Sequence, residues 1–508
     1  MELTRVISRV EPAPPWVDRR KRLESQQLSR SAPCPARALL SACRMLSPLA
    51  TALVLALAVT SLPARALTDL ERLEQLEQEV ALLKRKLEVQ QEDATAKAAT
   101  TPIVGAGPDG FFLKSPDSKY IFKLRGYAQA DSRWLTDSDT SGSDTFLIRR
   151  ARPIFEGTLA DVVDFKIMPD FAGSTLVLFD AYANLRYFPQ AQLMAGKFKP
   201  PLGLERLQSA TATMFTERGF PTYLVPNRDV GAMVWSDLAE GTFTYQIAAF
   251  NGVRDSGNNQ TGDVDTDDGK DVVARFFVHP FRPLKSEWLD NLGIGLAGSY
   301  GSVDDQSPAS FKTPAASTNF FQYRGASAAF AAVVGDGQRV RWSPQAYWYA
   351  GPFGLLAEYV SSQEEMRRDP LPAAPGDSNR AKLTHTAWQV AVSYALTGEN
   401  ASYKGLIPAS SFSPSEGTWG AFEVAARYGE IDFDDDSFSG GAASFADPAV
   451  AVTQAQGWTV GLNWYLNRYL KLMVDFDRTS FDGGASGVGN TGNRPSEETL
   501  FTRLQLTY

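Results

Sequence analysis

The last eight residues of the chain constrain its fold most strongly, because polar and apolar side chains alternate there up to a terminal aromatic. The polar set is Arg503, Gln505 and Thr507, and the apolar set is Leu504, Leu506 and Tyr508. A period of two places one set on each face of a strand. A soluble sheet can end in this way, but bacterial outer-membrane barrels commonly do, with the apolar face turned to lipid. The C-terminus therefore predicts a transmembrane β-barrel whose interior carries the function.

Composition narrows the alternatives. The chain has 508 residues and a formal net charge of −8, so nothing in it points to a nucleic-acid partner. After residue 66 no apolar run reaches the ~18–20 residues of a membrane-spanning helix, which leaves a closed barrel as the way to insert. Both cysteines, Cys34 and Cys43, precede the expected mature start. The mature chain would then have no thiol, and we expect neither a metal site nor a cofactor.

The N-terminal region is typical of an exported protein. Residues 48–63 form an apolar run followed by an A-x-A pattern, which predicts a signal peptide over residues 45–66. Residues 1–44 lack periodicity and lie upstream of that signal, so we interpret them as an overextension of the start site, with Met45 or a nearby residue as the natural start. A membrane anchor and lipid modification of Cys43 are the alternatives.

Residues 67–93 carry a heptad pattern. Apolar residues recur there at spacings of three and four, at Leu73, Leu76, Val80, Leu83 and Leu87. This seam predicts a periplasmic coiled coil. Three heptads are marginal alone, so the pattern also favours an oligomeric barrel, and we expect a homotrimer. A single amphipathic helix docked on the barrel is the alternative. Residues 94–110 are expected to be a linker.

Residues 111–508 are expected to form the barrel domain. Alternating segments are separated there by clusters of Gly, Asp, Asn, Ser and Pro, and about 400 residues suit about 16 antiparallel strands. The expected long polar loops are 251–270, 301–322, 361–381, 399–417 and 430–456. A soluble sandwich would need continuous apolar faces on both sheets, whereas these segments have one polar face.

The polar face is rich in cations. In the strand expected at 122–134, one parity reads Lys123, Arg125, Tyr127, Gln129, Asp131 and Arg133, and strand 271–279 adds Arg275. Rings of Arg and Lys in a narrow pore favour anions, and the planar guanidinium suits phosphate. The alternative is that these residues only solvate the lumen.

Residues 200–231 do not alternate well and contain several prolines. They also bring guanidinium groups close to hydroxyls, at Arg206, Ser209 and Arg218. We expect this segment to fold into the lumen and narrow it. The alternative is an external loop at a subunit contact.

Several stretches resemble the phosphate-selective porin O and P family. They are Leu147–Arg152, Lys197–Arg206, Thr216–Arg218, Gly457–Tyr465 and the closing strand, and the resemblance extends over residues 67–508. It implies a 16-stranded homotrimeric channel of the outer membrane for phosphate or polyphosphate. An arginine ladder leads to the constriction in that family.

The resemblance also implies roles for single residues. Arg149 and Arg150 fall on the ladder, and Arg218 falls on a constriction arginine. Arg206 replaces the family's constriction lysine, which keeps the charge but changes the donor geometry. Ser209 falls on the first of two anion-binding serines, and the second is replaced by Ala210. The predicted substrate-binding residues are Arg149, Arg150, Arg206, Ser209, Arg218, Lys123, Arg125 and Arg275.

These observations predict a porin that lets anions, above all phosphate or polyphosphate, diffuse across the bacterial outer membrane in contact with its lipid. A general or sugar-specific porin is the alternative, and a blocked structural barrel is another. We do not expect an enzyme, because the only imidazoles, His279 and His385, have no nucleophile motif or acidic group beside them.

Overall fold

The computed structural model describes residues 69–107, 110–136, 142–258, 268–313, 318–485 and 492–508. The start-site extension expected at 1–44 and the signal peptide expected at 45–66 lie outside this part of the chain. No helix in the described part is long and apolar enough to cross a membrane.

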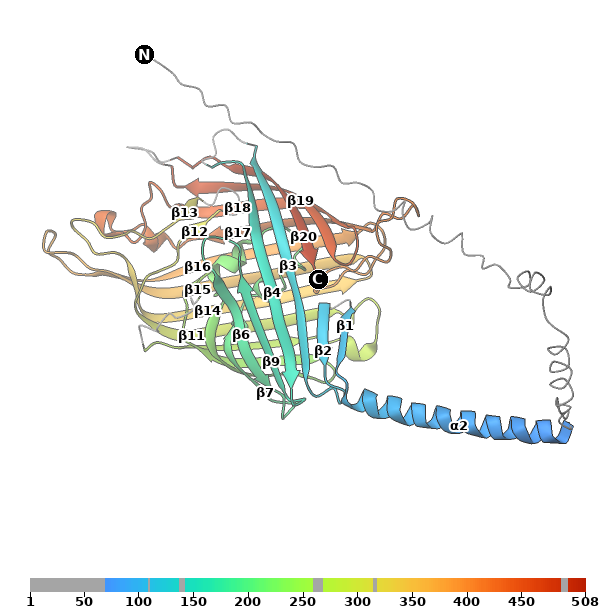
Figure 1. Ribbon diagram of the computed structural model, residues 1–508. Coiled ribbons are helices and arrows are strands. Elements are labelled where there is room, and N and C mark those ends of the chain that lie inside the picture. The colour runs from blue at the N-terminus through green and yellow to red at the C-terminus, as the bar shows by residue number, and fades with distance from the viewer. Residues whose placement is uncertain (1–68, 108–109, 137–141, 259–267, 314–317, 486–491) are drawn as a thin grey trace, which may run out of the picture. The chain divides into compact units, whose positions relative to one another are not determined.

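In the described part of the chain, sixteen antiparallel strands close into a barrel, as predicted (Figure 1). Each strand pairs with its neighbour in the sequence, and the last strand pairs with the first. The barrel strands are β3 (Ile121–Leu135), β4 (Thr145–Leu159), β5 (Val163–Asp170), β6 (Val177–Leu185), β7 (Gln192–Phe198), β8 (Asp229–Leu238), β9 (Phe243–Phe250), β10 (Asp271–Val278), β11 (Leu292–Gln306), β14 (Val334–Ala350), β15 (Phe353–Arg368), β16 (Asn379–Ala395), β17 (Ala421–Asp432), β18 (Val452–Tyr465), β19 (Leu470–Gly483) and β20 (Glu497–Thr507).

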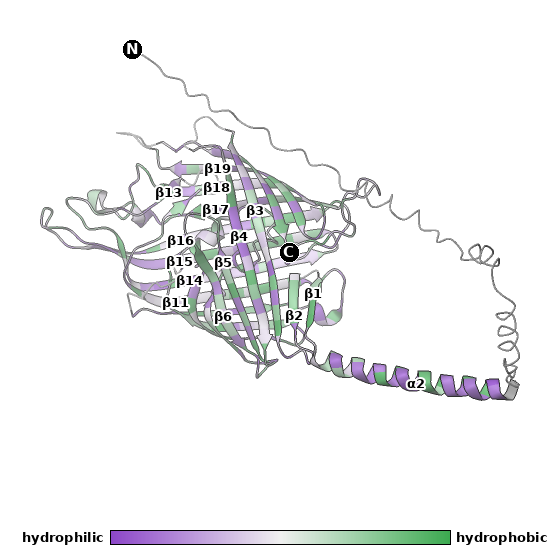
Figure 2. Ribbon diagram, in the orientation of Figure 1, coloured by the Kyte–Doolittle hydropathy of each residue, from purple (hydrophilic) through white to green (hydrophobic). Residues whose placement is uncertain are grey.

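The closing strand shows why the alternating pattern forms a barrel. On β20, Arg503 is fully buried and its guanidinium binds both carboxylate oxygens of Asp131 on β3, each at 2.7 Å. Leu504 and Leu506 point to the other face and are each 47% exposed. Hydrophilic and hydrophobic residues are interspersed along the other strands (Figure 2). The outer face is apolar, and the inward face carries most of the polar residues together with some buried apolar ones, such as Val273 and Phe277 on β10.

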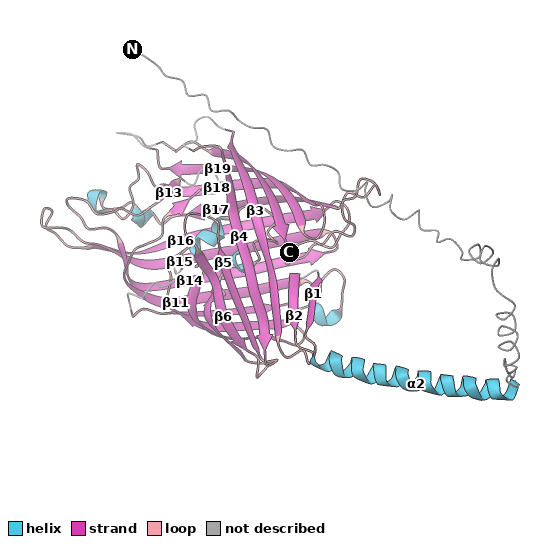
Figure 3. Ribbon diagram, in the orientation of Figure 1, coloured by secondary structure: helices cyan, strands magenta, loops and turns pink. Residues whose placement is uncertain are grey.

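Two pieces precede the barrel strands. The helix α2 (Asp69–Thr100) is the long helix of the described chain (Figure 3). Its heptad side chains are exposed, for example Leu73 at 59% and Leu87 at 64%. The segment expected as a linker, 94–110, contains the last turns of α2 and the strand β1 (Ile103–Gly107). β1 pairs with β2 (Gly110–Lys114), and β2 pairs with the beginning of β3.

The two ends of the barrel differ. At the turn end, most connections are short, as between β14 and β15, where Ala350 pairs with Phe353. The loop end carries the longer connections, including a small hairpin of β12 (Phe311–Lys312) and β13 (Asn319–Phe321). The segment 399–417, expected among the long loops, belongs to a long connection at the turn end. The remaining short helices are α3 (Leu204–Leu207), η1 (Phe220–Leu224), η2 (Arg282–Leu284), η3 (Asp435–Ser437) and η4 (Gly441–Ala443).

Candidate functional site

Residues 199–228, between β7 and β8, fold into the barrel; we call them the inward segment. Its prolines lack a backbone N–H and so do not suit a central strand. Polar side chains of several strands bind its backbone carbonyls instead. These contacts are Gln129 to Ala210 (3.0 Å), Lys471 to Thr213 (3.2 Å), Asn463 to Met214 (2.9 Å) and Gln505 to Thr211 (3.1 Å). These hydrogen bonds from the barrel wall hold the inward segment inside the lumen, where the sequence predicted that it would fold.

Carboxylates hold the other side of the inward segment. Glu358 on β15 accepts a hydrogen bond of 2.6 Å from the backbone N–H of Leu204, at the first residue of α3. Glu205 accepts one of 2.9 Å from the N–H of Gly219. Gln389 donates to both carboxylates, at 2.9 and 3.0 Å. A Cβ on Gly219 would lie 1.9 Å from the Gln389 side-chain oxygen, so a larger residue there would displace the Gln389 side chain.

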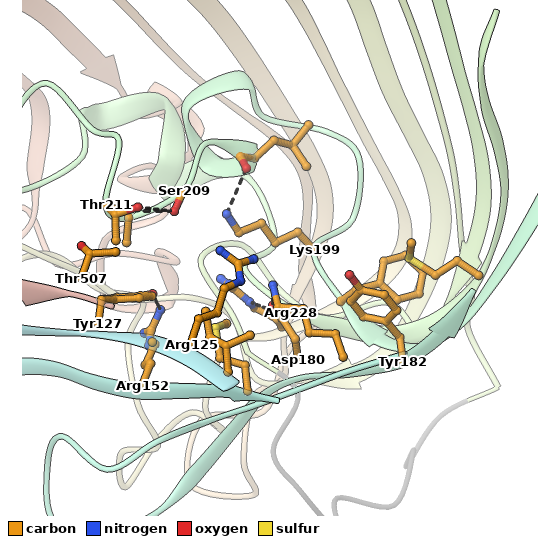
Figure 4. A pocket seen from close by; sticks show the side chains of 18 of the residues that line it. Arg125, Tyr127, Arg152, Asp180, Tyr182, Lys199, Ser209, Thr211, Arg228 and Thr507 are labelled. Carbon is orange, nitrogen blue, oxygen red and sulfur yellow. Dashed lines mark hydrogen bonds and ion pairs between the residues drawn. The ribbon is translucent and has the colours of Figure 1, made fainter. Parts of the chain in front are cut away.

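The inward segment lies between two cavities. The loop-end cavity, of about 480 Å³, is lined by the cations Arg133, Arg149, Arg150, Arg206, Arg218 and Lys312. Glu217 is the one carboxylate among its described lining residues. The turn-end cavity, of about 380 Å³, is lined by Arg125, Arg152, Lys166, Lys199, Arg218 and Arg228, with Asp180 as its carboxylate (Figure 4). Arg218 lines both cavities, so it stands at the boundary between them.

A β-bulge explains how two consecutive arginines reach the loop-end cavity. On β3, Gln129 pairs with Arg150 and Ala130 pairs with Ile148, so Arg149 is the extra residue on β4. A bulge re-aims side chains that a regular strand would place on opposite faces. Arg149 binds Glu217 through two contacts of 2.7 and 3.1 Å, and Arg150 donates to the Gln129 side-chain oxygen at 2.7 Å.

Glu217 gathers several arginines around one carboxylate. Besides Arg149, it binds Arg133 at 3.1 Å and lies 3.5 Å from Arg503. Burial alone would raise the pKa of Glu217, but the Arg149 guanidinium, with its other arginine neighbours, holds that pKa well below its usual range. Glu217 is therefore an anion at neutral pH, and it offsets part of the positive charge of the loop-end cavity.

Other cations near the boundary bind backbone carbonyls in place of carboxylates. Arg218 donates to the backbone carbonyls of Glu205 and Gln208 at 3.0 and 2.8 Å. Lys199 donates to the backbone carbonyls of Leu207 and Gln208 at 3.1 and 2.9 Å. Arg206 donates to the carbonyl of Thr222. Within the described chain, these three cations form no salt bridge with a carboxylate, so their charge is only partly offset, by the more distant carboxylates of Glu205 and Asp180.

Burial changes how readily these cations release protons. Burial and the neighbouring Arg228 and Arg218 lower the pKa of Lys199 well below that of an ordinary lysine. Burial also lowers the pKa of Arg206 and of Arg218. Guanidinium groups remain protonated in proteins at neutral pH, so Lys199 is the group of this set that can titrate.

The turn-end cavity also presents two hydroxyls. Ser209 is exposed to the cavity, and its oxygen lies 2.8 Å from the hydroxyl oxygen of Thr211 (Figure 4). The Gln129 and Gln505 contacts to the carbonyls of Ala210 and Thr211 fix this turn from the wall side. The Ser209 oxygen also accepts a hydrogen bond of 3.3 Å from the backbone N–H of Thr211, so the turn holds both hydroxyls at the cavity.

Arginines on the opposite wall of the turn-end cavity are ordered by an aromatic ring. A register shift opposite Met168 and Pro169 makes Phe179 the extra residue of β6. The guanidinium carbons of Arg152 and Arg228 lie 3.8 and 4.9 Å from its ring centroid. Each of these arginines also binds an aspartate, Arg152 with Asp170 at 2.7 Å and Arg228 with Asp180 at 3.1 Å.

The structure brings six of the eight predicted site residues to the two cavities. Arg149, Arg150, Arg206 and Arg218 line the loop-end cavity, and Arg125, Ser209 and Arg218 line the turn-end cavity. Lys123 and Arg275 line neither. Lys123 is half-buried, and Arg275 on β10 binds Gln345 and Gln246 at 3.0 and 3.1 Å.

The prediction omitted several cavity cations, which are Arg133, Arg152, Lys166, Lys199, Arg228 and Lys312. The sequence does contain features that indicate some of these cations. Arg152 has the same strand parity as Arg150, and Lys199 belongs to the stretch that precedes the prolines. No sequence feature indicates Lys312, because its position depends on how the long connection between β11 and β14 folds.

The chain matches the model of one protein family and one curated relative. Residues 122–508 match the family model described as phosphate-selective porin O and P. Porin O of Pseudomonas aeruginosa is 25% identical over 433 residues, which cover 78% of this chain and 91% of that protein.

Solved structures give weaker likenesses. The outer membrane channel DcaP of Acinetobacter baumannii has a TM-score of 0.46 at 14% identity, covering 78% of this chain and 99% of that one. OmpF of Salmonella typhi, in complex with daunomycin, has a TM-score of 0.48 at 12% identity, covering 77% and 98%. Because both TM-scores are below 0.5, the sixteen-stranded barrel is inferred from the strand pairing of this chain and not from these two structures.

Proposed function

Because the chain belongs to the phosphate-selective porin O and P family, and is thus a porin of the bacterial outer membrane, we propose that it conducts phosphate-like oxyanions. It is a channel and not an enzyme. The proposed substrates are inorganic phosphate and polyphosphate, which would diffuse down their gradients from one cavity to the other past the inward segment.

The observation that carries the proposal is that Arg206, Arg218 and Lys199 form no salt bridge within the described chain. Arg218 lines both cavities, Arg206 lines the loop-end cavity and Lys199 lines the turn-end cavity, and their donors bind backbone carbonyls. A cation in a narrow, low-dielectric passage attracts anions and repels cations much more strongly than one in open water. Selective passage also requires that the ion binds weakly enough to leave. The backbone carbonyls occupy some of the hydrogen-bond donors of these cations, which weakens their binding of an anion.

The hydroxyl pair supports the oxyanion part of the proposal. The resemblance placed a second anion-binding hydroxyl at residue 210, where this chain has Ala210. Thr211 supplies a hydroxyl 2.8 Å from that of Ser209 in the same cavity. We therefore propose Ser209 and Thr211 as neutral ligands that replace part of the water shell of a tetrahedral anion, beside Lys199 and Arg218.

We further propose that the porin is a homotrimer joined in part by α2. The heptad side chains of this helix are exposed, which suits a parallel coiled coil. Cross-linking of the full-length protein and of a variant lacking residues 69–92 tests this. A trimer that dissociates more readily in the shortened variant is expected. Equal trimer stability in the two proteins would contradict a role for α2.

A general or sugar-specific porin is the competing function. Sugar channels rely on aromatic surfaces along the path. Tyr347 packs here against Phe277, His279 and Tyr403, away from both cavities. The turn-end cavity does have aromatic lining residues, which are Tyr127, Tyr182, Phe198 and Tyr508, but they share it with six cations. The reversal potential of the channel in a planar bilayer under a KCl gradient separates these functions. The proposal predicts a potential close to that of chloride, and a potassium preference would contradict it.

A further inference from the structure

The connection between β11 and β14 carries a lysine to the loop-end cavity. Lys312 ends β12, and its side chain is exposed and lines that cavity together with Arg149, Arg150 and Arg206. In the described part of the chain its ammonium group has no salt bridge. This differs from Arg149, whose guanidinium is occupied by Glu217.

The hairpin that carries Lys312 is anchored by aromatic side chains. Phe311, Phe320 and Phe321 are each at most 1% exposed. Phe321 stacks on Phe433 with a centroid distance of 3.9 Å and an interplanar angle of 5°. Fully burying a phenylalanine stabilises a structure by about 1.5–3 kcal/mol, so three of them hold the hairpin firmly in the mouth of the barrel.

The hairpin is also joined to the inward segment. The Tyr223 ring meets the rings of Phe311 and Phe320 edge-on, each at 5.8 Å between centroids. The Tyr223 hydroxyl donates to the backbone carbonyl of Lys312 at 2.7 Å. The main chain of Lys312 is therefore fixed relative to the segment that bears Arg206, while its long side chain is exposed.

We propose that Lys312 is an anion-capture residue. Its ammonium group binds a phosphate ion that enters from the loop end and passes it to the guanidinium groups of the inward segment, first that of Arg206. A flexible ammonium group suits this task, because it follows a hydrated ion without the fixed fork geometry of arginine. The inference rests on the proposed anion conduction.

The test uses the full-length porin in planar bilayers, with wild type and Lys312→Gln compared channel by channel. Inorganic phosphate is added to one side and then to the other, and the rate at which it blocks the chloride current is measured. In 0.1 M KCl the association rate from one side only should fall about threefold, as expected for one unit charge a few ångströms from the ion in water. In 1 M KCl the difference should vanish, because the Debye length falls from about 10 to about 3 Å.

Three further variants sharpen the result. Lys312→Arg keeps the charge, so it should retain a rate between that of Lys312→Gln and that of the wild type. Lys285→Gln, at an exposed lysine that lines neither cavity, should keep the wild-type rate. Tyr223→Phe removes the hydrogen bond to Lys312, and it should lower the same one-sided rate by a smaller factor.

Two outcomes would overturn the inference while the proposed function stands. One is an unchanged association rate in Lys312→Gln, in a wild-type channel that prefers anions and is blocked by phosphate. The other is an equal change from both sides that persists in 1 M KCl, which would indicate altered constriction geometry. A wild-type channel that prefers potassium would refute the proposed function itself.

Discussion

Arg149 and Glu217 form a bidentate ion pair in the loop-end cavity, with Nε–Oε1 and Nη2–Oε2 distances of 2.7 and 3.1 Å. The pair joins the bulge on β4 to the inward segment. It also reduces the charge that Arg149 offers to a passing anion. The predicted ladder arginines therefore differ in role: Arg149 holds the inward segment, whereas Arg150 binds a neutral glutamine side chain and keeps its charge available.

Glu217→Gln is expected to strengthen anion binding and weaken the fold. Loss of the carboxylate removes the salt-bridge partner of Arg149 and one of the two carboxylates near Arg133, so phosphate should remain longer in the channel. The Arg149–Glu217 pair is partly buried, so its loss should cost less than the ~3–5 kcal/mol of a fully buried pair, and the barrel should still unfold at a lower temperature. Single-channel dwell times and heat-dependent mobility of the folded barrel on gels measure the two effects.

Glu498→Gln is the matched control for that variant, because Glu498 pairs with Arg478 at 3.3 Å on partly exposed strand residues. It should change neither property. A Glu217→Gln channel with unaltered dwell times would mean that Glu217 does not offset the cavity charge.

Arg218→Gln should cause a larger loss of phosphate affinity than Arg206→Gln, because Arg218 lines both cavities and Arg206 lines one. A hydrogen bond to a charged group contributes about 1.5–3 kcal/mol, which corresponds to a loss of about tenfold to a hundredfold. Titration of the chloride current with phosphate gives the affinity. Arg218→Lys should retain more affinity than Arg218→Gln, and equal loss in both would show that geometry, and not charge, is what Arg218 provides.

Removing a hydroxyl from Ser209 or Thr211 should weaken phosphate binding more than chloride binding. Thr211→Val and Ser209→Ala should each weaken inhibition by phosphate about tenfold, the value of one hydrogen bond to an anion. Thr211→Ser keeps the hydroxyl and should behave as wild type. The control Thr242→Val alters a residue that lines neither cavity. Parallel losses of phosphate and chloride binding would contradict a ligand role for the hydroxyls.

Lys199 predicts a pH dependence. Burial and neighbouring arginines lower its pKa, so it loses its proton at a lower pH than an ordinary lysine, whose pKa is about 10.4. The cation is present below its pKa and absent above it. Anion conductance should therefore fall as pH rises towards the ordinary lysine range, and Lys199→Arg should remove this fall. Identical pH profiles for the two channels would exclude Lys199 as the titrating group.

The sequence was sufficient for the barrel but only partly for the site. Alternation along strands such as β20 depends on the period of two and on the difference between lipid and lumen, and both are local properties. The prolines of the inward segment likewise showed that it is not a strand. These features required no knowledge of distant contacts.

The remaining features depend on register and on long connections. The bulges at Arg149 and Phe179 arise from pairing with β3 and β5, so alternation within a single strand does not predict them. Arg275 was expected at the site because its strand parity is inward, but neighbouring glutamines occupy its guanidinium. Lys312 reaches the cavity through aromatic packing between residues about 90–160 positions apart in the sequence.

Phosphate inhibition of the chloride current through the wild-type channel tests the central claim most directly. Millimolar or lower phosphate, added at constant KCl to a planar bilayer holding the full-length porin, should reduce the chloride current in a saturable manner, and Arg218→Gln should require much more phosphate. A chloride current that phosphate leaves unchanged at any concentration would contradict an oxyanion site between the two cavities.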